Sequence, residues 1–166
     1  MTLDIQGLER AIVRHCSPTL AAMKPGCLFN VPGAFAMDPD ERPASRPESW
    51  RAVQSRKEAL DRAVERSNVR LNPCGVEVRV IARRLCGALV FVFRPDLLER
   101  ALREPRVSDR LTARGYDLTG AGWLERAIRL LGSRLERCHK RDPNAAFPHE
   151  SGFFLGYPYA DVTGFI

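Results

Sequence analysis

The apolar run from Ala88 to Phe93 constrains the fold of this 166-residue chain more than any other feature. A continuous apolar run of this length, closed by Arg94 and Pro95, is typical of a strand that is buried on both faces. The run is much shorter than the roughly 18 to 20 residues that cross a bilayer. We therefore expect a central strand in a soluble protein and no transmembrane helix.

Other periodic patterns predict the elements around this strand. Val76, Val78 and Val80 alternate with polar residues, which indicates a half-buried strand that pairs antiparallel with the central one across the segment 83–87. Residues 27–31 predict a third, short strand. Apolar spacing and capping residues predict helices over 5–15, 18–24, 48–67, 96–103 and 119–141, then a helix over 148–156 and one more helical turn over 159–165. The fold class expected is α+β, with a small, mostly antiparallel sheet of about three strands packed against several helices.

The amount of apolar sequence predicts a single domain over residues 1–166. With 45% hydrophobic residues in 18.6 kDa, the chain can bury roughly two thirds of its unfolded surface around one core. In the opening helix, Ile5, Leu8, Ile12 and His15 lie on one stripe, so His15 is expected to face the core. Prolines recur from Pro32 to Pro47, so we expect a flexible loop over 32–47.

The N-terminus and the cysteines predict a cytoplasmic protein. Residues 1–14 contain Asp4 and Glu9 and show neither the basic start nor the apolar stretch of a signal peptide. Five cysteines without a C-x-x-C pair are expected to be reduced thiols, and they do not fit a structural zinc ribbon.

Two surface features suggest macromolecular partners. The net charge is +6, and the predicted helix 119–141 carries six cations on one face, which favours nucleic-acid binding. No aromatic residue lies on that face to stack bases. The alternative is a charged helix face that is simply exposed to solvent. Six of the 13 aromatic residues lie in the last twenty positions, which favours a protein-interaction surface or a homo-oligomer. These six are Phe147, Phe153, Phe154, Tyr157, Tyr159 and Phe165.

Two distant segments contain the side chains best suited to catalysis. Cys16 precedes the predicted helix that starts at Pro18, where a thiol next to His15 can have a depressed pKa. His149 and Glu150 are suited to proton transfer or metal binding. We take these four residues as catalytic candidates; a core histidine, an inert thiol and a favourable first-turn glutamate are the alternatives. Position 153 is Phe, so H-E-x-x-H zinc-protease chemistry is excluded.

Three further residues are candidates for ligand binding. Lys24 and Arg94 stand at the ends of a predicted helix and strand, where a cation can meet a carboxylate or phosphate, with surface or capping roles as the alternative. Tyr157 joins them from the C-terminal segment. No dinucleotide fingerprint, P-loop or G-x-S-x-G elbow is present.

The stretches His15-Cys16-Ser17-Pro18-Thr19-Leu20 and Phe147-Pro148-His149-Glu150, together with Phe154-Leu155-Gly156-Tyr157-Pro158, resemble an uncharacterised bacterial family, the domain of unknown function 3793. The similarity spans nearly the whole chain, and it departs from the family pattern at Phe93, where tyrosine is usual, and at Ser151, where an aliphatic residue is usual. The resemblance implies a further terminal segment beyond Ile166 and brings no established activity.

These observations lead to one main hypothesis and two alternatives. The main hypothesis is a small-molecule, metal or cofactor site between the N-terminal His-Cys region and the C-terminal Phe-Pro-His-Glu motif. The identity of the metal or cofactor and the existence of a reaction are left open. The alternatives are the protein-interaction module and the basic helix that binds nucleic acid.

Overall fold

A three-stranded antiparallel sheet forms the centre of the computed structural model, which describes residues 5–36, 47–139 and 146–164. Its strands are β1 (Gly26–Pro32), β2 (Glu77–Arg84) and β3 (Gly87–Phe93), in the order β1-β3-β2. All residues of β3 are buried. The predictions of a central strand and of an α+β fold are therefore confirmed.

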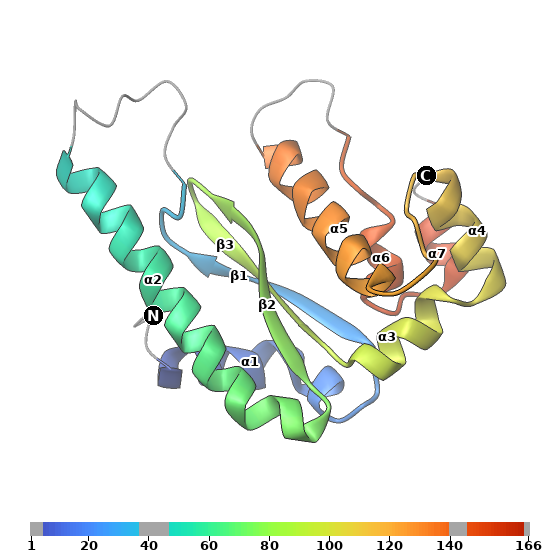
Figure 1. Ribbon diagram of the computed structural model, residues 1–166, viewed down its shortest axis with the longest axis horizontal. Coiled ribbons are helices and arrows are strands. Elements are labelled where there is room, and N and C mark those ends of the chain that lie inside the picture. Colours follow the sequence, from blue (N-terminus) through green and yellow to red (C-terminus); the bar gives the residue numbers. More distant parts are fainter. Residues whose placement is uncertain (1–4, 37–46, 140–145, 165–166) are drawn as a thin grey trace.

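Helices cover both faces of this sheet (Figure 1). One face carries α1 (Ile5–Leu20) and α2 (Pro47–Leu71), and a 3-10 turn, η2 (Asn72–Cys74), leads from α2 into β2. The other face carries α3 (Pro95–Leu102), α4 (Pro105–Ala113), α5 (Trp123–His139), α6 (Ser151–Phe154) and α7 (Tyr159–Thr163). The N-terminal and C-terminal helices therefore lie on opposite faces of the sheet.

The alternation of side chains along β3 divides the interior into two cores. Leu89, Phe91 and Phe93 point into the core beneath α3 to α7. Ala88, Val90 and Val92 point into the core beneath α1 and α2. Because neighbouring strand residues face opposite ways, one uninterrupted apolar segment supplies both cores.

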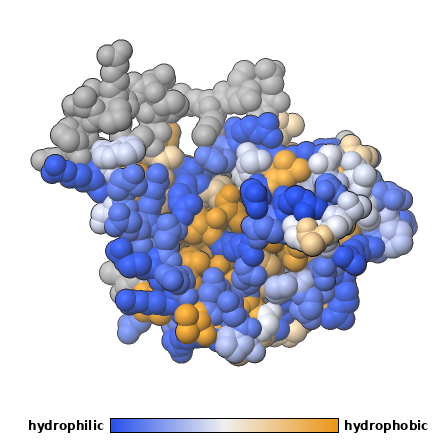
Figure 2. Space-filling view, in the orientation of Figure 1, coloured by the Kyte–Doolittle hydropathy of each residue, from blue (hydrophilic) through white to orange (hydrophobic). Residues whose placement is uncertain are grey.

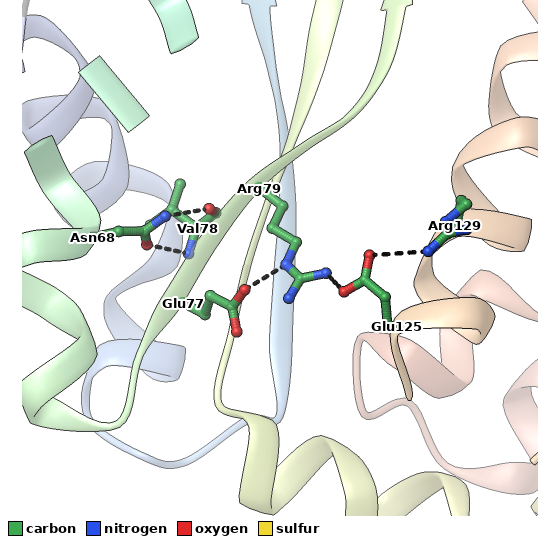
Figure 3. A network of polar contacts seen from close by, with 6 residues as sticks. All are labelled: Asn68, Glu77, Val78, Arg79, Glu125 and Arg129. Carbon is green, nitrogen blue, oxygen red and sulfur yellow. Dashed lines mark hydrogen bonds and ion pairs between the residues drawn. The ribbon is translucent and has the colours of Figure 1, made fainter. Parts of the chain in front are cut away.

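Polar side chains tie the edge strand β2 to helices on either side of it (Figure 3). The amide of Asn68 on α2 bonds both backbone groups of Val78, at 2.8 Å each. Arg79 forms ion pairs with Glu77 on its own strand and with Glu125 on α5. Asn68 therefore pairs part of an edge that would otherwise be open to other strands, and Arg79 links β2 to α5.

The predicted break between helices 5–15 and 18–24 is confirmed by the non-helical backbone of Cys16, which divides α1 into two helical parts. Several predicted helix boundaries differ from the structure, and the second part of α1 ends at Leu20. The predicted cap Thr119 is instead in a turn, where its N–H and hydroxyl both donate to Asp117. Positive-φ glycines at 120 and 122 then delay the start of α5 to Trp123.

The predicted loop over 32–47 is too broad. Pro32 is the last residue of β1, and Pro47 is the first residue of α2. Phe35 is fully buried, and its N–H bonds the carbonyl of Arg84 at 2.9 Å. The rest of this prediction, over residues 37–46, lies outside the described residues.

The surface is mixed in polarity, and Figure 2 shows apolar side chains exposed over the strands between the hydrophilic surfaces of α2 and α5. Val80 and Ile81 on β2 are half-buried. Within the described residues, no helix combines the length and the hydropathy needed to cross a membrane.

Candidate functional site

The kink in α1 separates the environments of the two N-terminal candidates. Cys16 has a non-helical backbone (φ −117°, ψ 16°), and Pro18 lacks the N–H that would bond the preceding turn. Cys16 is fully buried. His15 is exposed, with its ring stacked on Phe29 at 5.5 Å between centroids. The expectation that His15 faces the core is therefore wrong, because its ring lies over β1 beside the kink.

Arg94 holds the end of α1 in place. Its guanidinium donates to the carbonyl oxygens of Thr19 (2.8 Å), Leu20 (2.6 Å) and Cys74 (3.1 Å). Its own backbone N–H donates to the carbonyl of Pro25 at 2.9 Å. The side chain of Arg94 therefore has a structural role, because it binds three backbone carbonyls at the ends of α1 and η2, and its ligand-binding role stays a prediction.

The turn after α1 packs directly against the C-terminal segment. A Cβ at Gly156, which has φ +74°, would lie 2.5 Å from Cδ of Pro25. A Cβ at Gly26 would lie 2.6 Å from the carbonyl oxygen of Phe154. Because two glycines allow this close approach, residues from both ends of the chain meet at one place.

A cavity of about 120 Å³, which we call the junction cavity, opens where these segments meet. His15, Lys24 and Tyr157 are three of the predicted residues that line it, and the Lys24 ammonium lies 5.0 Å from the centroid of the Tyr157 ring. The remaining lining residues are Pro18, Thr19, Gly26, Cys27, Leu28 and Leu155. Among the described residues, the cavity lining therefore includes one ammonium and no carboxylate.

A second cavity, of about 170 Å³, lies on the far side of Tyr157 and is called the C-terminal cavity. His149 lines it together with Phe147 and Asp161, and its ring meets that of Phe147 edge-on at 5.3 Å. Tyr157 lines both cavities. The structure therefore brings His15, Lys24 and Tyr157 together and places His149 in a neighbouring cavity.

Glu150 lies apart from both cavities, in a cluster of charged and aromatic side chains. It is 1% exposed and forms an ion pair with Arg134 on α5, and the Tyr116 hydroxyl donates to it at 3.3 Å. Arg114 approaches its second oxygen at 3.5 Å. Burial, followed by the charge of Glu150, raises the pKa of Tyr116. This arrangement anchors the start of α6 to α5, and the catalytic role of Glu150 stays a prediction.

Cys27 is a residue at this site that the sequence analysis did not select. It is the second residue of β1, it is partly exposed, and it lines the junction cavity. Its thiol donates to the carbonyl of His15, the residue before Cys16, at 3.0 Å. The signal available in the sequence was a second cysteine closely following Lys24, on the far side of the predicted helix and turn.

The two thiols have pKa values that move in opposite directions. The hydrogen bond from Cys16 lowers the pKa of Cys27 most; partial burial opposes this, and the Lys24 ammonium and the Leu28 N–H lower it further, to about 7. The pKa of Cys16 is raised by its hydrogen bond to Cys27, by burial and by the charge on Cys27. At neutral pH Cys27 is therefore the thiol that ionises.

Thr19 is a second residue that the sequence analysis did not select. It is fully buried, it lines the junction cavity, and its hydroxyl has no hydrogen-bond partner among the residues that the structure describes. Buried hydroxyl groups are nearly always bonded to protein or to water. The Thr19 hydroxyl is therefore a buried polar group in a residue that lines the cavity.

The metal hypothesis has no support among residues 5–36, 47–139 and 146–164. There, no three His, Cys, Asp or Glu side chains are grouped closely enough to hold an ion. His15 instead stacks on Phe29.

The fold leaves fewer exposed residues for the two alternatives, the aromatic interaction surface and the basic helix, and both stay predictions. Phe153 and Phe154 are buried in the core of the chain itself, whereas Phe147 and Tyr157 are about half exposed. On α5, each of three predicted surface cations forms an ion pair with an acidic residue, namely Arg126 with Asp117, Arg129 with Glu125 and Arg134 with Glu150. Lys140 and Arg141 lie outside the described residues.

Comparison with family models shows the protein family to which the chain belongs. The model of the family described as "Protein of unknown function (DUF3793)" matches residues 12–166. The chain belongs to this family. The match confirms the resemblance drawn from the two sequence motifs. Neither curated proteins nor solved structures gave a match.

Proposed function

We propose that this DUF3793 protein binds the anionic head group of a small molecule in the junction cavity. The observation that carries the proposal is the unpartnered Thr19 hydroxyl, fully buried at the wall of a cavity that Lys24 also lines. An ammonium and a hydroxyl together suit a carboxylate, since both donate hydrogen bonds to it. A charge-assisted bond of this kind contributes about 1.5 to 3 kcal/mol.

The size of the cavity sets the size of the head group. About 120 Å³ equals the space of roughly four water molecules at about 30 Å³ each. A carboxylate with one or two attached carbons fits this space, and the rest of a larger molecule extends outward past His15 and Tyr157, both of which are exposed. The apolar wall formed by Leu28 and Leu155 suits the carbon atoms of such a fragment.

The test compares propionate with propanol and propylammonium, which have similar shape and differ in charge. The amide signals of Thr19, Cys27 and Leu28 in the ¹⁵N-labelled protein are followed during titration. We expect propionate alone to shift them in a saturable way. Equal shifts from the three compounds, or shifts confined to other regions, would overturn the proposal.

Two variants test whether propionate binds in the junction cavity. Thr19→Val keeps the shape of the side chain and removes the hydroxyl, and Lys24→Gln removes the charge. Each is expected to weaken propionate binding about tenfold, which corresponds to about 1.4 kcal/mol. Lys57→Gln is the matched control, because Lys57 lies on α2 and does not line the cavity; its affinity should equal that of the wild type.

A second proposal is a protein partner that covers the C-terminal cavity. Phe147 (47% exposed) and Tyr157 (50% exposed) border this cavity, and exposed aromatic side chains are common at interfaces. Light scattering of the purified chain tests the homo-oligomer. A dimer that Phe147→Ser disrupts would support it, and a monomer at high concentration would exclude self-association as the use of this surface.

A further inference from the structure

Two neighbouring cysteines lie at the junction cavity, Cys27 in its lining and Cys16 buried behind it, and binding of an anion alone does not explain them. Cys16 lies at the kink of α1, and Cys27 lies near the start of β1. The Cys27 sulfur lies 3.0 Å from the carbonyl oxygen of His15, the residue bonded to Cys16, so the two cysteines are neighbours in space. Both are free thiols. The fold therefore brings together two cysteines on different elements, with one of them at the wall of a cavity.

The two sulfur atoms differ in their access to a reagent. Cys27 is partly exposed and lines the cavity, whereas Cys16 has no exposed surface. A reagent in the cavity can reach Cys27, whereas Cys16 is buried and does not line the cavity. This asymmetry is the arrangement required of an attacking thiol and a resolving thiol.

We propose that Cys27 attacks small disulfides that enter the junction cavity, and that Cys16 then resolves the mixed disulfide. The inference rests on the proposed function in one respect: the Lys24 and Thr19 site orients a disulfide whose end carries a carboxylate. The substrate class is thus a low-molecular-weight disulfide with an anionic end group.

The exchange proceeds in two balanced steps. The Cys27 thiolate attacks one sulfur of R–S–S–R, forming the bond from Cys27 to sulfur and releasing R–S⁻. The Cys16 sulfur then attacks Cys27, the second R–S group leaves, and the proton of Cys16 goes to that departing thiolate. The products are a Cys16–Cys27 disulfide and two R–SH once the first thiolate takes a proton from water. The substrate is the oxidant, and the two protein thiols are oxidised.

The structure contains groups that favour each step. The Cys16 hydrogen bond, the Leu28 N–H and the Lys24 ammonium stabilise the attacking thiolate. Once Cys27 carries the mixed disulfide, it has no negative charge, so its contribution to the high pKa of Cys16 disappears. The kink at Cys16 already interrupts the helix, which allows its sulfur to approach Cys27 without breaking a regular turn.

The experiment uses the full chain with the other three cysteines, Cys74, Cys86 and Cys138, changed to serine. Three small disulfides of similar size serve as probes: dithiodiglycolate (anionic), hydroxyethyl disulfide (neutral) and cystamine (cationic). Intact-mass spectrometry follows the reaction over time. We expect the protein to lose two hydrogens and to retain no adduct, because Cys16 resolves the intermediate.

Single variants separate the roles of the two thiols. Cys16→Ser should accumulate one adduct, located on Cys27 by peptide mapping, and Cys27→Ser should react at least about tenfold more slowly and form no internal disulfide. Should the multiple-serine protein fail to fold, the wild-type chain treated with dithiodiglycolate must still yield a peptide that links residues 16 and 27. Absence of this link, or a lasting adduct on Cys27 of the wild type, overturns the inference.

The probe series distinguishes this inference from the proposed function. Dithiodiglycolate should react about tenfold faster than cystamine, and Lys24→Gln should remove that preference while Lys57→Gln keeps it. Reaction through Cys27 without charge preference overturns the anion site and leaves the thiol pair supported. Binding of propionate without any disulfide exchange overturns the thiol pair and leaves the anion site supported.

Discussion

Replacing Glu150 by glutamine should test whether this residue stabilises the fold or serves a reaction. The carboxylate is 1% exposed and contacts Arg134, Arg114 and Tyr116. Glu150→Gln preserves its size and leaves the arginines without their counter-charge. Breaking a buried pair on one side costs about 3 to 5 kcal/mol.

The cost at this site is at the lower end of that range. The Arg134 side chain is 23% exposed, so water can solvate part of its charge in the variant. We therefore expect the free energy of unfolding to fall by about 3 kcal/mol. For a chain of this size, such a change lowers Tm by about 6 to 12 °C.

Urea denaturation followed by circular dichroism provides the measurement. Glu58→Gln is the matched control, because Glu58 is 68% exposed and pairs with Arg62 on the same helix; its effect should stay below about 0.5 kcal/mol. In the double variant Glu150→Gln and Arg134→Met, the loss of unfolding free energy should be about 1 to 3 kcal/mol smaller than the sum of the losses in the two single variants. If Glu150→Gln is as stable as Glu58→Gln, the carboxylate is not an anchor of the fold.

Three further predictions concern the Cys27 thiol, the close packing of Gly156 and the buried ring of Phe35. The rate of Cys27 alkylation by iodoacetamide should rise with pH and be half-maximal near pH 7, because Cys16, Lys24 and the Leu28 N–H lower the thiol pKa to about 7; Lys24→Gln should move the midpoint upward, and an unchanged midpoint would remove Lys24 from this role. Gly156→Ala should lower the free energy of unfolding by about 1 to 3 kcal/mol more than Gly120→Ala, since both have positive φ but only Gly156 faces a neighbouring atom at 2.5 Å; equal losses of stability would contradict the close packing against Pro25. Phe35→Ala should cost about 3 to 5 kcal/mol in urea unfolding because the ring is fully buried, whereas a loss below about 1 kcal/mol would show that this segment does not pack.

Local patterns were sufficient to predict most of the elements. The strand at 88–93 was recognised because a short apolar run closed by Arg94-Pro95 fits a central strand and little else. The helices followed from periodicity and from proline at their first positions. The start of α5 was missed because the turn before it depends on glycine φ angles, and α4 was missed altogether.

The site was only partly predictable. Lys24, His15 and Tyr157 were selected, and they line one cavity. His149 lines the adjacent cavity, and Glu150 pairs with Arg134 from another helix. Whether a buried acid catalyses or anchors depends on its neighbours in space, which the order of residues does not show.

By itself, the sequence determined the α+β class, the central strand and which chemically versatile side chains each end of the chain carries. These properties depend on hydropathy and backbone preferences over a few neighbouring residues. The tertiary structure alone decided that Cys27 lies beside the kink at Cys16, that Thr19 is buried at the wall of a cavity, and that two glycines let the ends of the chain touch. Such contacts join residues far apart in sequence, and they are fixed by how helices and strands pack, which no local pattern specifies.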